Sequence, residues 1–480
     1  MKHVHTELFI AGEWVRPAST TGNVVIGAAT EEPLGRTPLG TPADIDTAVR
    51  AARRAVDGPG WSDAAPAHRA DVLDRFAAAL TARSDVLAAL VSSENGMPIT
   101  KSASANVLAP AATLSYYASL ARGLDLEEER TAFAGGVTRV RREPVGVVGA
   151  IVPWNYPIML AMMKIAPALA AGCSLVVKPA VETALSAYVV AEAAAEAGLP
   201  PGVLNIVPGG REVSQALVSH PDVDKVAFTG STPVGRSIGE VCGRLLKPVT
   251  LELGGKSAAV ILDDADLDAT AAALAHVALP NNGQTCYAST RILAPASRYP
   301  EALEAITAMA ASLTVGDPLD PATGVGPVVS ARQRESIERH IAAGRAAGAQ
   351  VTTGGGRPEH LTRGWYVEPT VFGDVRNDMS IAQEEIFGPV VVVIPYRDEE
   401  EAVALANDSE FGLGGSVWSC DTERANEVAR RIRTGSVGIN GYNLDLASPF
   451  GGRKGSGLGR ELGPEGLAAY FQLKSVYQAV

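Results

Sequence analysis

The 480-residue chain has little cysteine and no surplus of basic charge. Its four cysteines, at positions 173, 242, 286 and 420, lie far apart and form no CxxC pair. This spacing excludes a disulfide scaffold and a zinc-knuckle pattern. Lys and Arg number 41 against 53 Asp and Glu, a formal net charge of −12. Because clustered Lys and Arg bind phosphate backbones, this charge argues against a nucleic-acid partner. The seven histidines are scattered, so we expect no metal site.

Signals for secretion and for membrane insertion are also missing. The first residues, MKHVHTELFIAGEWVRP, contain no sustained apolar core of the kind that a signal peptide has. The uncharged stretch from Pro144 to Met163 is long enough to span a bilayer, but Pro153, Asn155 and Pro157 interrupt it. We therefore expect a buried strand, a turn and a buried helix there, in a cytoplasmic protein with no membrane partner.

Short apolar runs alternate with helical patterns along most of the chain. Helical periodicity covers 43–57 and 67–95, and the apolar runs then include VGVVGAIV, SLVVKP, VLNIVP and KVAFTG. A second series begins at SAAVIL and continues with RILAP, VEPTVFG and VVVVIPY. Such alternation predicts an α/β fold with two doubly wound parallel sheets. We assign 1–121 and 144–253 to a dinucleotide-binding domain and 254–446 to a second α/β domain.

Two segments fit neither domain. Residues 122–143 are polar and close with VTRVRRE, and the C-terminal segment 464–480 includes AAYFQLKSVYQAV. Both alternate as exposed strands do, so they either add to the sheet edge of a partner or form surface strands of a monomer.

The dinucleotide fingerprint GxGxxG is absent, and the segment TGSTPVGR at 229–236 is the candidate phosphate site instead. Thr232 is expected to cap a helix that begins at Pro233, with Gly230 allowing close approach of a ligand. The N–H groups at that helix end and the Ser231 hydroxyl suit pyrophosphate, although a tight turn without ligand has the same pattern. A P-loop is disfavoured because Arg236 stands where a lysine is required.

Three polar residues are candidates for chemistry. Cys286 lies in the loop NNGQTCYASTR and is either a thiolate nucleophile or a buried small hydrophobe. Glu252 lies inside an apolar strand and is followed closely by two glycines, which suits a general base of raised pKa or an ion-paired carboxylate. Asn155, in PWNYP, suits an oxyanion donor or a local backbone contact.

Taken together, the segments PWN, KPA, FTGST, LELGGKS, GQTC, EEIFGP and PFGGRKGSG occur in an order that resembles the NAD(P)-dependent aldehyde dehydrogenase superfamily over nearly the whole chain. The resemblance implies oxidation of an aldehyde to a carboxylic acid, with 254–446 as the catalytic domain. Cys286 then forms a thiohemiacetal and a thioester, Asn155 and the backbone N–H of Cys286 hold the oxyanion, and Glu252 activates water. The segments 122–143 and 464–480 resemble the family's oligomerisation element, which implies a homodimer or homotetramer.

The same resemblance implies a cofactor site and a proton relay. The cofactor residues are Trp154, Lys178, Val181, Gly210, Phe228, Gly230, Ser231, Val234, Glu385 and Phe387. We expect NAD, and NADP stays open because Val181 stands where many NAD-preferring members have a glutamate. Lys164 and Glu461 match a pair assigned to proton relay, for which a structural ion pair is an equal alternative.

The expected substrate residues come from separate segments of the chain. Asn155 begins a helix, so Leu160 and Met163 are expected to line a tunnel, with Thr285, Tyr287 and Tyr442. No Arg or Lys in these stretches stands out as a clamp for an anion, which favours an apolar aliphatic or aromatic aldehyde. Two rival functions are a CoA-acylating semialdehyde dehydrogenase and a catalytically silent binding protein on the same fold. The first needs no water-activating glutamate, and the intact Cys286, Glu252 and Asn155 argue against the second.

Overall fold

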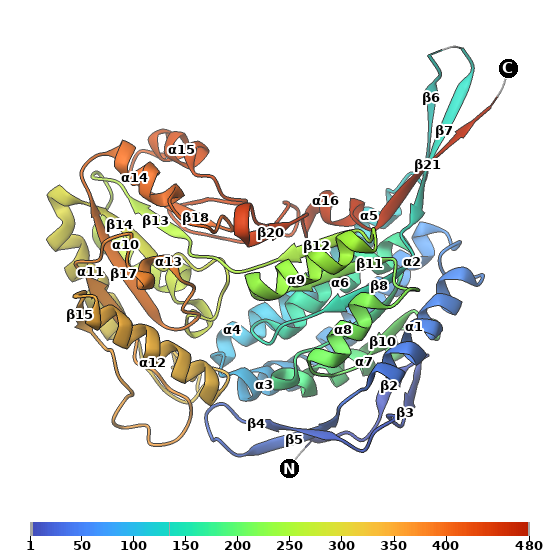
Figure 1. Ribbon diagram of the computed structural model, residues 1–480, viewed down its shortest axis with the longest axis horizontal. Helices are drawn as coiled ribbons and strands as arrows, with labels where there is room; N and C mark the ends of the chain where they lie inside the picture. Colours follow the sequence, from blue (N-terminus) through green and yellow to red (C-terminus); the bar gives the residue numbers. More distant parts are fainter. Residues whose placement is uncertain (1–2, 134, 479–480) are drawn as a thin grey trace.

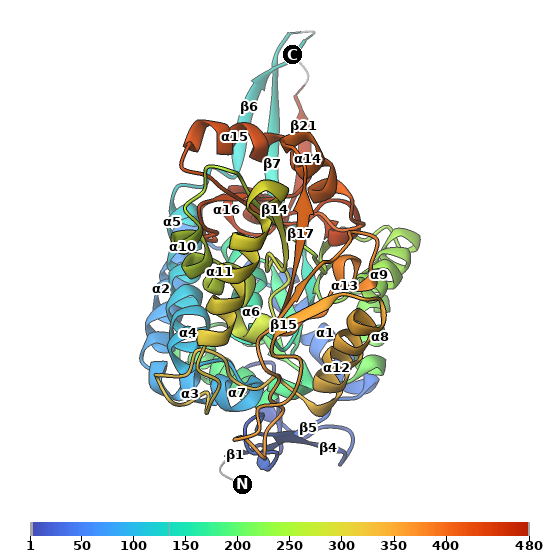
Figure 2. The ribbon, with the colours of Figure 1, turned by 90° about the vertical axis from the view of Figure 1, so that its left-hand side faces the viewer.

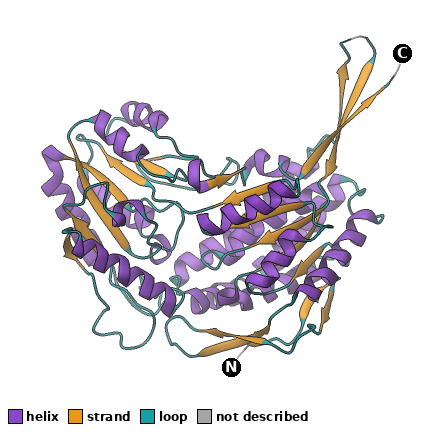
Figure 3. Ribbon diagram, in the orientation of Figure 1, coloured by secondary structure: helices purple, strands orange, loops and turns teal. Residues whose placement is uncertain are grey.

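The computed structural model describes residues 3–133 and 135–478, which form two large α/β lobes and a protruding arm (Figure 1). A small sheet of β1 (His3–Val4), β4 (Gly22–Ile26) and β5 (Pro33–Pro38) lies at the N-terminal end. Figure 3 shows helices on both faces of each large sheet. The mixed α/β architecture with parallel-sheet lobes confirms the predicted fold class.

The first large sheet has the strand order β20-β12-β11-β8-β9-β10-β2-β3, in which the strands from β12 to β10 are parallel. Strand order reverses between β8 and β11, and such a reversal opens a crevice beyond the carboxyl ends of the strands. The strands are β2 (Leu8–Ile10), β3 (Glu13–Val15), β8 (Val147–Ile151), β9 (Ser174–Lys178), β10 (Leu204–Ile206), β11 (Lys225–Thr229), β12 (Val249–Glu252) and β20 (Gly457–Leu458).

The second large sheet has the order β15-β16-β17-β14-β13-β18-β19. All its neighbours are parallel except the edge pair β15 and β16. Its strands are β13 (Ala258–Ile261), β14 (Arg291–Pro295), β15 (Gln350–Thr353), β16 (Thr370–Gly373), β17 (Val390–Tyr396), β18 (Gly415–Trp418) and β19 (Gly438–Ile439). The chain passes from the first sheet to the second across Leu253–Ser257, so the two lobes meet at the segment that joins β12 to β13.

Helices flank both sheets. Those of the first lobe are α1 (Pro42–Asp57), α2 (Pro66–Thr81), α3 (Ser84–Asn95), α4 (Ile99–Ala103), α5 (Ala109–Arg122), α6 (Pro157–Ala171), α7 (Ala184–Glu196), α8 (Arg211–Ser219) and α9 (Thr232–Arg244). Those of the second lobe and the C-terminal segment are α10 (Leu267–Ala278), α11 (Tyr299–Ser312), α12 (Ala331–Ala346), α13 (Ser380–Gln383), α14 (Glu399–Asn407), α15 (Thr422–Arg431) and α16 (Gly463–Ala468). In Figure 2 the second lobe faces the viewer, with α10, α11 and α12 in front.

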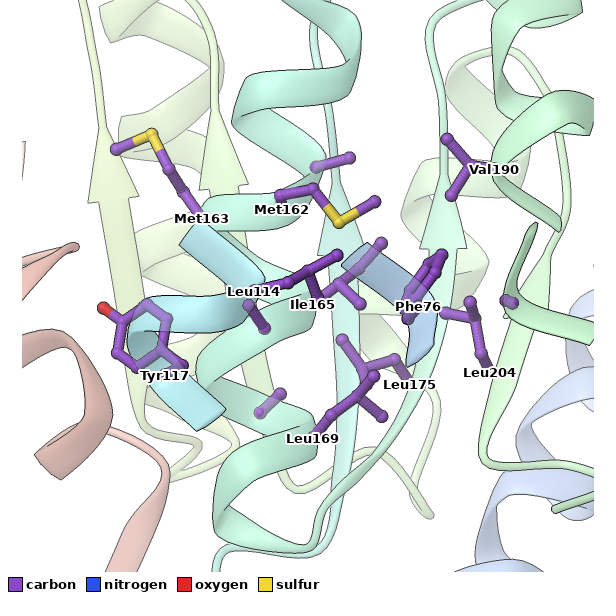
Figure 4. Close-up of a cluster of buried hydrophobic side chains, with 14 of the residues drawn as sticks. Phe76, Leu114, Tyr117, Met162, Met163, Ile165, Leu169, Leu175, Val190 and Leu204 are labelled. Atoms are coloured by element: carbon purple, nitrogen blue, oxygen red, sulfur yellow. The ribbon is translucent and has the colours of Figure 1, made fainter. Parts of the chain in front are cut away.

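Helix α6 lies at the centre of the first lobe. Each of its residues is buried, because it packs between the sheet on one side and α2 and α5 on the other. Figure 4 shows Met162, Met163, Ile165 and Leu169 of α6 among side chains from α2, α5 and the sheet. A helix that is apolar on all sides is stable only as a core helix, which is what the uncharged stretch after Pro157 forms.

The arm is a three-stranded antiparallel sheet. It contains β6 (Glu127–Thr131), β7 (Val137–Pro144) and β21 (Phe471–Tyr477), with β7 in the middle. The pairing of Phe471 with Pro144 and of Tyr477 with Thr138 joins the two segments that the sequence left unassigned. Figure 1 shows the arm projecting away from both lobes. Residues 134, 479 and 480 of these predicted strands, like residues 1 and 2 of the first domain, lie outside the described residues.

Most predicted elements are present, with two corrections. The helical stretch 67–95 is two helices, α2 and α3, which meet at Ala82 and Arg83. Ser231, rather than Thr232, is the residue that precedes α9, so Pro233 is the second residue of the helix. Pro is tolerated there because the N–H groups of the first turn have no acceptor within the helix.

Within the described residues, no single helix is both long and apolar enough to cross a membrane. The pair α2 and α3 passes that test by length and composition only when joined, across a bend of 69°.

Candidate active site

The carboxyl ends of the parallel strands carry most of the predicted cofactor residues. Trp154 follows β8, Lys178 ends β9, and Gly230 follows β11. Gly210 comes after β10, at the exposed start of α8. Parallel strands end at one edge of a sheet, so these residues converge on the crevice where strand order reverses.

The start of α9 presents an anion-binding end to this crevice. Ser231 is exposed and its hydroxyl makes no capping bond, and Val234 in the first turn is 48% exposed. A Cβ on Gly230 would come within 2.4 Å of the Phe228 ring, so a larger residue would displace that buried ring. The free N–H groups of the first turn and the helix dipole favour a bound anion.

Lys178 is a cation at the carboxyl end of β9. It is 9% exposed, and burial lowers the pKa of its ammonium group to about 8, with Glu182 opposing that shift. Glu182 also lies 3.9 Å from Arg332. Val181 begins the short helical turn that follows β9, and its carbonyl accepts a hydrogen bond from Asn23.

A loop of the second lobe closes over the segment between the sheets. The Glu385 carboxylate accepts a hydrogen bond of 2.9 Å from the N–H of Gly255, and a Cβ on Gly254 would lie 2.6 Å from it. Burial raises the pKa of Glu385 to about 7, against the effects of this hydrogen bond and of Lys256. Phe387, with a φ of 55°, meets Trp154 edge to face at 5.3 Å. Phe387 of one lobe thus contacts Trp154 of the other, and Glu385 contacts the segment that joins the two sheets.

The Cys286 loop is held by amide side chains. Asn281 and Asn282 precede it with φ values of 50° and 61°, a left-handed conformation that Asn tolerates. Asn281 donates to the carbonyl of Asn155 at 2.9 Å, and Asn155 donates through Nδ2 to the carbonyl of Gln284 at 3.0 Å. These bonds fix the Asn155 amide two residues from Cys286.

Cys286 and Asn155 line a cavity of about 390 Å³. The predicted tunnel residues Leu160, Met163, Tyr287 and Tyr442 line it too. Tyr287 stacks on Tyr442 with ring centres 4.7 Å apart, and Phe450 meets Tyr287 edge to face at 6.2 Å. The inner wall is therefore sulfur, aliphatic and aromatic.

Thr285 is not one of the residues that line the cavity. Its side chain is buried, and its hydroxyl shares a hydrogen bond of 2.8 Å with Tyr156 and donates to the carbonyl of Pro280 at 3.0 Å. Thr285 was predicted to line the tunnel. Its hydrogen bonds instead hold the side chain behind Tyr156, which does line the cavity.

Glu252 is the last residue of β12 and is 2% exposed. Neither carboxyl oxygen has a hydrogen-bond partner among the described residues. Burial, and then Glu461, raise the pKa of Glu252 well above its ordinary value, while Lys164 and Arg460 oppose the shift. Gly451 leaves room for this carboxyl group, because a Cβ there would lie 2.5 Å from Oε1.

Lys164 and Glu461 form a buried ion pair beside Glu252. The distance from Lys164 Nζ to Glu461 Oε1 is 2.8 Å, and Lys164 also donates to the Thr229 hydroxyl at 2.6 Å. Both charged groups are buried, and Lys164 is fully so. A buried charge is stable only when it is paired, so the pair is at least a structural one.

The surroundings of Cys286 favour the thiol over the thiolate in the free protein. Burial raises the pKa of the thiol, and the carboxylates of Glu385 and Glu252 raise it further. A nucleophilic Cys286 must therefore lose its proton to a base when it attacks.

Sequence reasoning missed part of the cavity wall. The additional residues that line it are Lys101, Ser104, Ala105, Ala109, Tyr156, Met159, Asn443, Leu444, Leu446 and Phe450. Met159 had a usable signal, because it lies one helical turn after Asn155. The residues from 101 to 109 had none, since they come from a distant segment with no pattern that relates it to Cys286.

Comparison with known proteins identifies the family. Residues 14–476 match the model of the aldehyde dehydrogenase family. The chain belongs to that family. Among its aldehyde dehydrogenase relatives is geranial dehydrogenase of Castellaniella defragrans, 55% identical over 98% of both chains. Another is 3-succinoylsemialdehyde-pyridine dehydrogenase of a Pseudomonas species, 43% identical over 98% of both.

Solved aldehyde dehydrogenases have the same fold. A Mycobacterium tuberculosis aldehyde dehydrogenase complexed with NAD+ matches with a TM-score of 0.98 and 48% identity, covering 100% of this chain and 99% of its own. Aldehyde dehydrogenase C of Pseudomonas syringae, complexed with NAD+ and octanal, matches with a TM-score of 0.95 and 39% identity, covering 98% and 96%. Membership of the aldehyde dehydrogenase family confirms the predicted enzyme class.

Proposed function

We propose that this aldehyde dehydrogenase oxidises an apolar aldehyde to its carboxylic acid with NAD+, through a covalent bond to Cys286. The observation that carries the proposal is that Cys286 and Asn155 line the same cavity, whose other lining residues are mostly apolar. A soft nucleophile and a fixed amide donor are what acyl chemistry on an aldehyde requires.

Residues of the first lobe suit a dinucleotide. The uncapped start of α9, with Gly230 and Ser231, offers N–H groups to a pyrophosphate, and Lys178 adds a cation beside it. Glu385 and Phe387 would hold the nicotinamide end from the second lobe. When bound, NAD+ accepts the hydride that leaves the substrate carbon. Related structures that contain NAD+ support this cofactor over NADP.

The protein residues carry the remaining steps. The Cys286 thiol releases its proton to a solvent base as its sulfur bonds to the carbonyl carbon, and the carbonyl oxygen becomes an oxyanion. Asn155 Nδ2 has a second hydrogen, besides the one given to Gln284, for that oxyanion, and the N–H of Cys286 supplies another. Loss of hydride leaves a thioester. Glu252 then takes a proton from water, which attacks the thioester, releases the acid and restores Cys286.

Proton removal from Glu252 has a proposed route. Lys164 and Glu461 lie next to this carboxyl group and influence its pKa in opposite directions. We assign them the transfer of the proton away from Glu252 between turnovers, in addition to their structural pairing.

The substrate class rests on the cavity wall and on two relatives. Leu160, Met163, Tyr287 and Tyr442 provide apolar surface, and burying such surface is favourable by about 25 cal/mol per Å². A geranial dehydrogenase at 55% identity and a neighbour complexed with octanal both point to unbranched or terpenoid aldehydes of moderate length.

We also propose a homo-oligomer built through the arm, in the cytoplasm. Leu473, Val476 and Tyr477 of β21 are exposed, and a partner that covers them would bury apolar surface. All four cysteines are unpaired, as expected in a reducing compartment. The division at 253/254 into cofactor and catalytic domains, with the arm separate, is part of the same proposal.

The test is NAD+ reduction with octanal, geranial, benzaldehyde and succinic semialdehyde, without coenzyme A. We expect turnover with the apolar aldehydes and none in Cys286→Ala. Turnover that starts only after coenzyme A is added would overturn the hydrolytic route and assign the chain to acylating chemistry. NAD+ binding without turnover of any aldehyde, with or without coenzyme A, would favour a silent binding protein.

A further inference from the structure

The apolar cavity has one cation in its wall. Lys101, in α4, lines the same cavity as Cys286 although the two are 185 positions apart. The other polar residues of the lining are Ser104, Asn155, Asn443 and the tyrosines, all of which are uncharged. Cys286 carries a charge only when its thiol is ionised. Lys101 therefore dominates the electrostatic character of the lining.

Lys101 lies at the outer end of the cavity. Two other lining residues, Ser104 and Asn443, are exposed, whereas Asn155 and Met163 are buried. Lys101 itself is half-buried, which desolvates its ammonium group. A substrate whose aldehyde reaches Cys286 must place its far end toward Ser104, Asn443 and Lys101.

The charge of Lys101 is not compensated nearby. Among the described residues no carboxylate lies within 4.0 Å of its ammonium group. Burial alone lowers the pKa of this lysine, and no charged group contributes to the shift. Lys164, which is buried nearby in α6, is paired with Glu461 and does not line this cavity. Uncompensated charge in a partly desolvated wall acts on a ligand more strongly than charge in open water.

We propose that Lys101 is a specificity-determining residue that rejects aldehydes with a positively charged far end and admits those with a neutral or anionic one. The inference rests on the proposed oxidation of aldehydes at Cys286 and deepens it. Repulsion between two cations at the mouth raises the free energy of the bound substrate, and it does so equally in the transition state. The effect therefore falls on kcat/KM through KM.

This selectivity separates the chain from some of its relatives. Betaine aldehyde dehydrogenase of Amaranthus hypochondriacus and an aminoaldehyde dehydrogenase of Malus domestica are each 42% identical to it. Their names describe substrates with an ammonium or amino group. We expect such substrates to be poor here although the fold is shared.

The experiment compares two aldehydes of the same shape. The first is 4-(trimethylammonio)butanal, which carries a positive charge on a quaternary nitrogen. The second is 5,5-dimethylhexanal, which has a quaternary carbon at the same position and is neutral. For the wild type we expect kcat/KM to favour the neutral aldehyde by more than tenfold. In Lys101→Met that ratio falls about three- to tenfold, as expected for one partly screened charge pair, and in Lys101→Glu it falls further. Lys101→Arg retains the wild-type ratio.

Two controls separate this inference from the proposed function. Arg376→Met removes an exposed cation elsewhere and keeps the wild-type ratio, so a change there would assign the effect to net charge. The discrimination also weakens as salt is raised, because the mouth is open to solvent. No oxidation of 5,5-dimethylhexanal or of any other aldehyde would overturn the proposed function. Oxidation with a ratio that is the same in wild type, Lys101→Met and Lys101→Glu would overturn the role of Lys101 alone.

Discussion

The surroundings of Glu252 raise the pKa of its carboxyl group. A carboxyl group without hydrogen-bond partners, at the buried end of a strand, holds its proton to a higher pH than a carboxyl in water. A carboxylate whose pKa is raised takes a proton from water near neutral pH more readily than an ordinary carboxylate does. Burial also raises the pKa of the Cys286 thiol.

The first prediction concerns Glu252→Gln. We expect this variant to release one equivalent of NADH per active site in a burst and then to turn over about 100-fold more slowly, because water attack loses its base. Stopped-flow absorbance measures the burst and the slow phase separately. Steady-state turnover of the wild type should rise with pH as Glu252 loses its proton, with its midpoint above 4.5, the ordinary carboxyl value.

Cys286→Ala serves as the control for this prediction, since it gives neither a burst nor turnover. A Glu252→Gln variant that also lacks the burst would contradict the assigned role and place Glu252 in the attack of Cys286 on the aldehyde.

The site could be predicted from sequence where chemistry is local. Cys286 in a polar loop, Glu252 at the end of an apolar strand and Asn155 at a turn each stand out by contrast with their neighbours. Lys101 and Tyr156 do not, because their importance comes from packing against residues that are distant in the sequence. Thr285 was misplaced for the same reason: adjacency to Cys286 says nothing about which side of the loop faces the cavity.

At the scale of elements, α7 depends on a group from another helix. Glu94, in α3, is fully buried and accepts hydrogen bonds from the N–H groups of Leu185 at 2.7 Å and Ser186 at 3.3 Å. These are first-turn donors of α7, which have no partner in their own helix. Burial raises the pKa of Glu94 to about 8 in spite of both bonds.

The second prediction follows from that pKa. Because the folded protein binds a proton at Glu94 that the unfolded chain loses near pH 4.5, this residue stabilises the fold at low pH. The contribution declines as pH rises from about 4.5 to about 8. We expect the Tm of the wild type to fall over this range more steeply than that of Glu94→Gln, which cannot titrate. Parallel Tm profiles from scanning calorimetry would show that Glu94 is already ionised when folded.

Strand and helix order could be predicted because the apolar period changes clearly from element to element. The residues at which helices begin and end could be predicted less well from the sequence. The break between α2 and α3 has no Gly or Pro; Arg83 marks it by donating to the carbonyl of Ala79 and pairing with Glu196, a contact from α7. Helix α9 begins one residue early because Thr232 fits the first turn, with its hydroxyl bonded to the carbonyl of Gly455. Both features depend on tertiary partners.

At the scale of the whole molecule, the arm is the part least explained by a single chain. Most of the described residues in its three strands are half-buried or exposed, and Leu473 and Tyr477 are 69% and 80% exposed. Isolated sheets of this size are marginal without a covering surface. A second chain that packs on the arm would supply that surface.

The third prediction is that light scattering gives a multiple of the chain mass, and that Leu473→Asp combined with Tyr477→Asp shifts it toward the monomer. Charges on this surface oppose burial at an interface. Leu319→Asp, an equal change at another exposed leucine, should leave the mass unchanged. A monomeric wild type would contradict the proposal, as would a double variant that keeps the full oligomeric mass.

The path of the last residues has a consequence for synthesis. After the second lobe is complete, the chain returns to pair β20 with β12 beside Glu252, places Glu461 against Lys164, and ends as β21 in the arm. Domains generally fold in order from the N-terminus as a chain is synthesised. Here the edge strand of the first sheet, β20, belongs to the last part of the chain to be synthesised. A nascent chain that ends before residue 457 lacks the strand that pairs with Leu251 and Glu252, so this edge of the first sheet stays open.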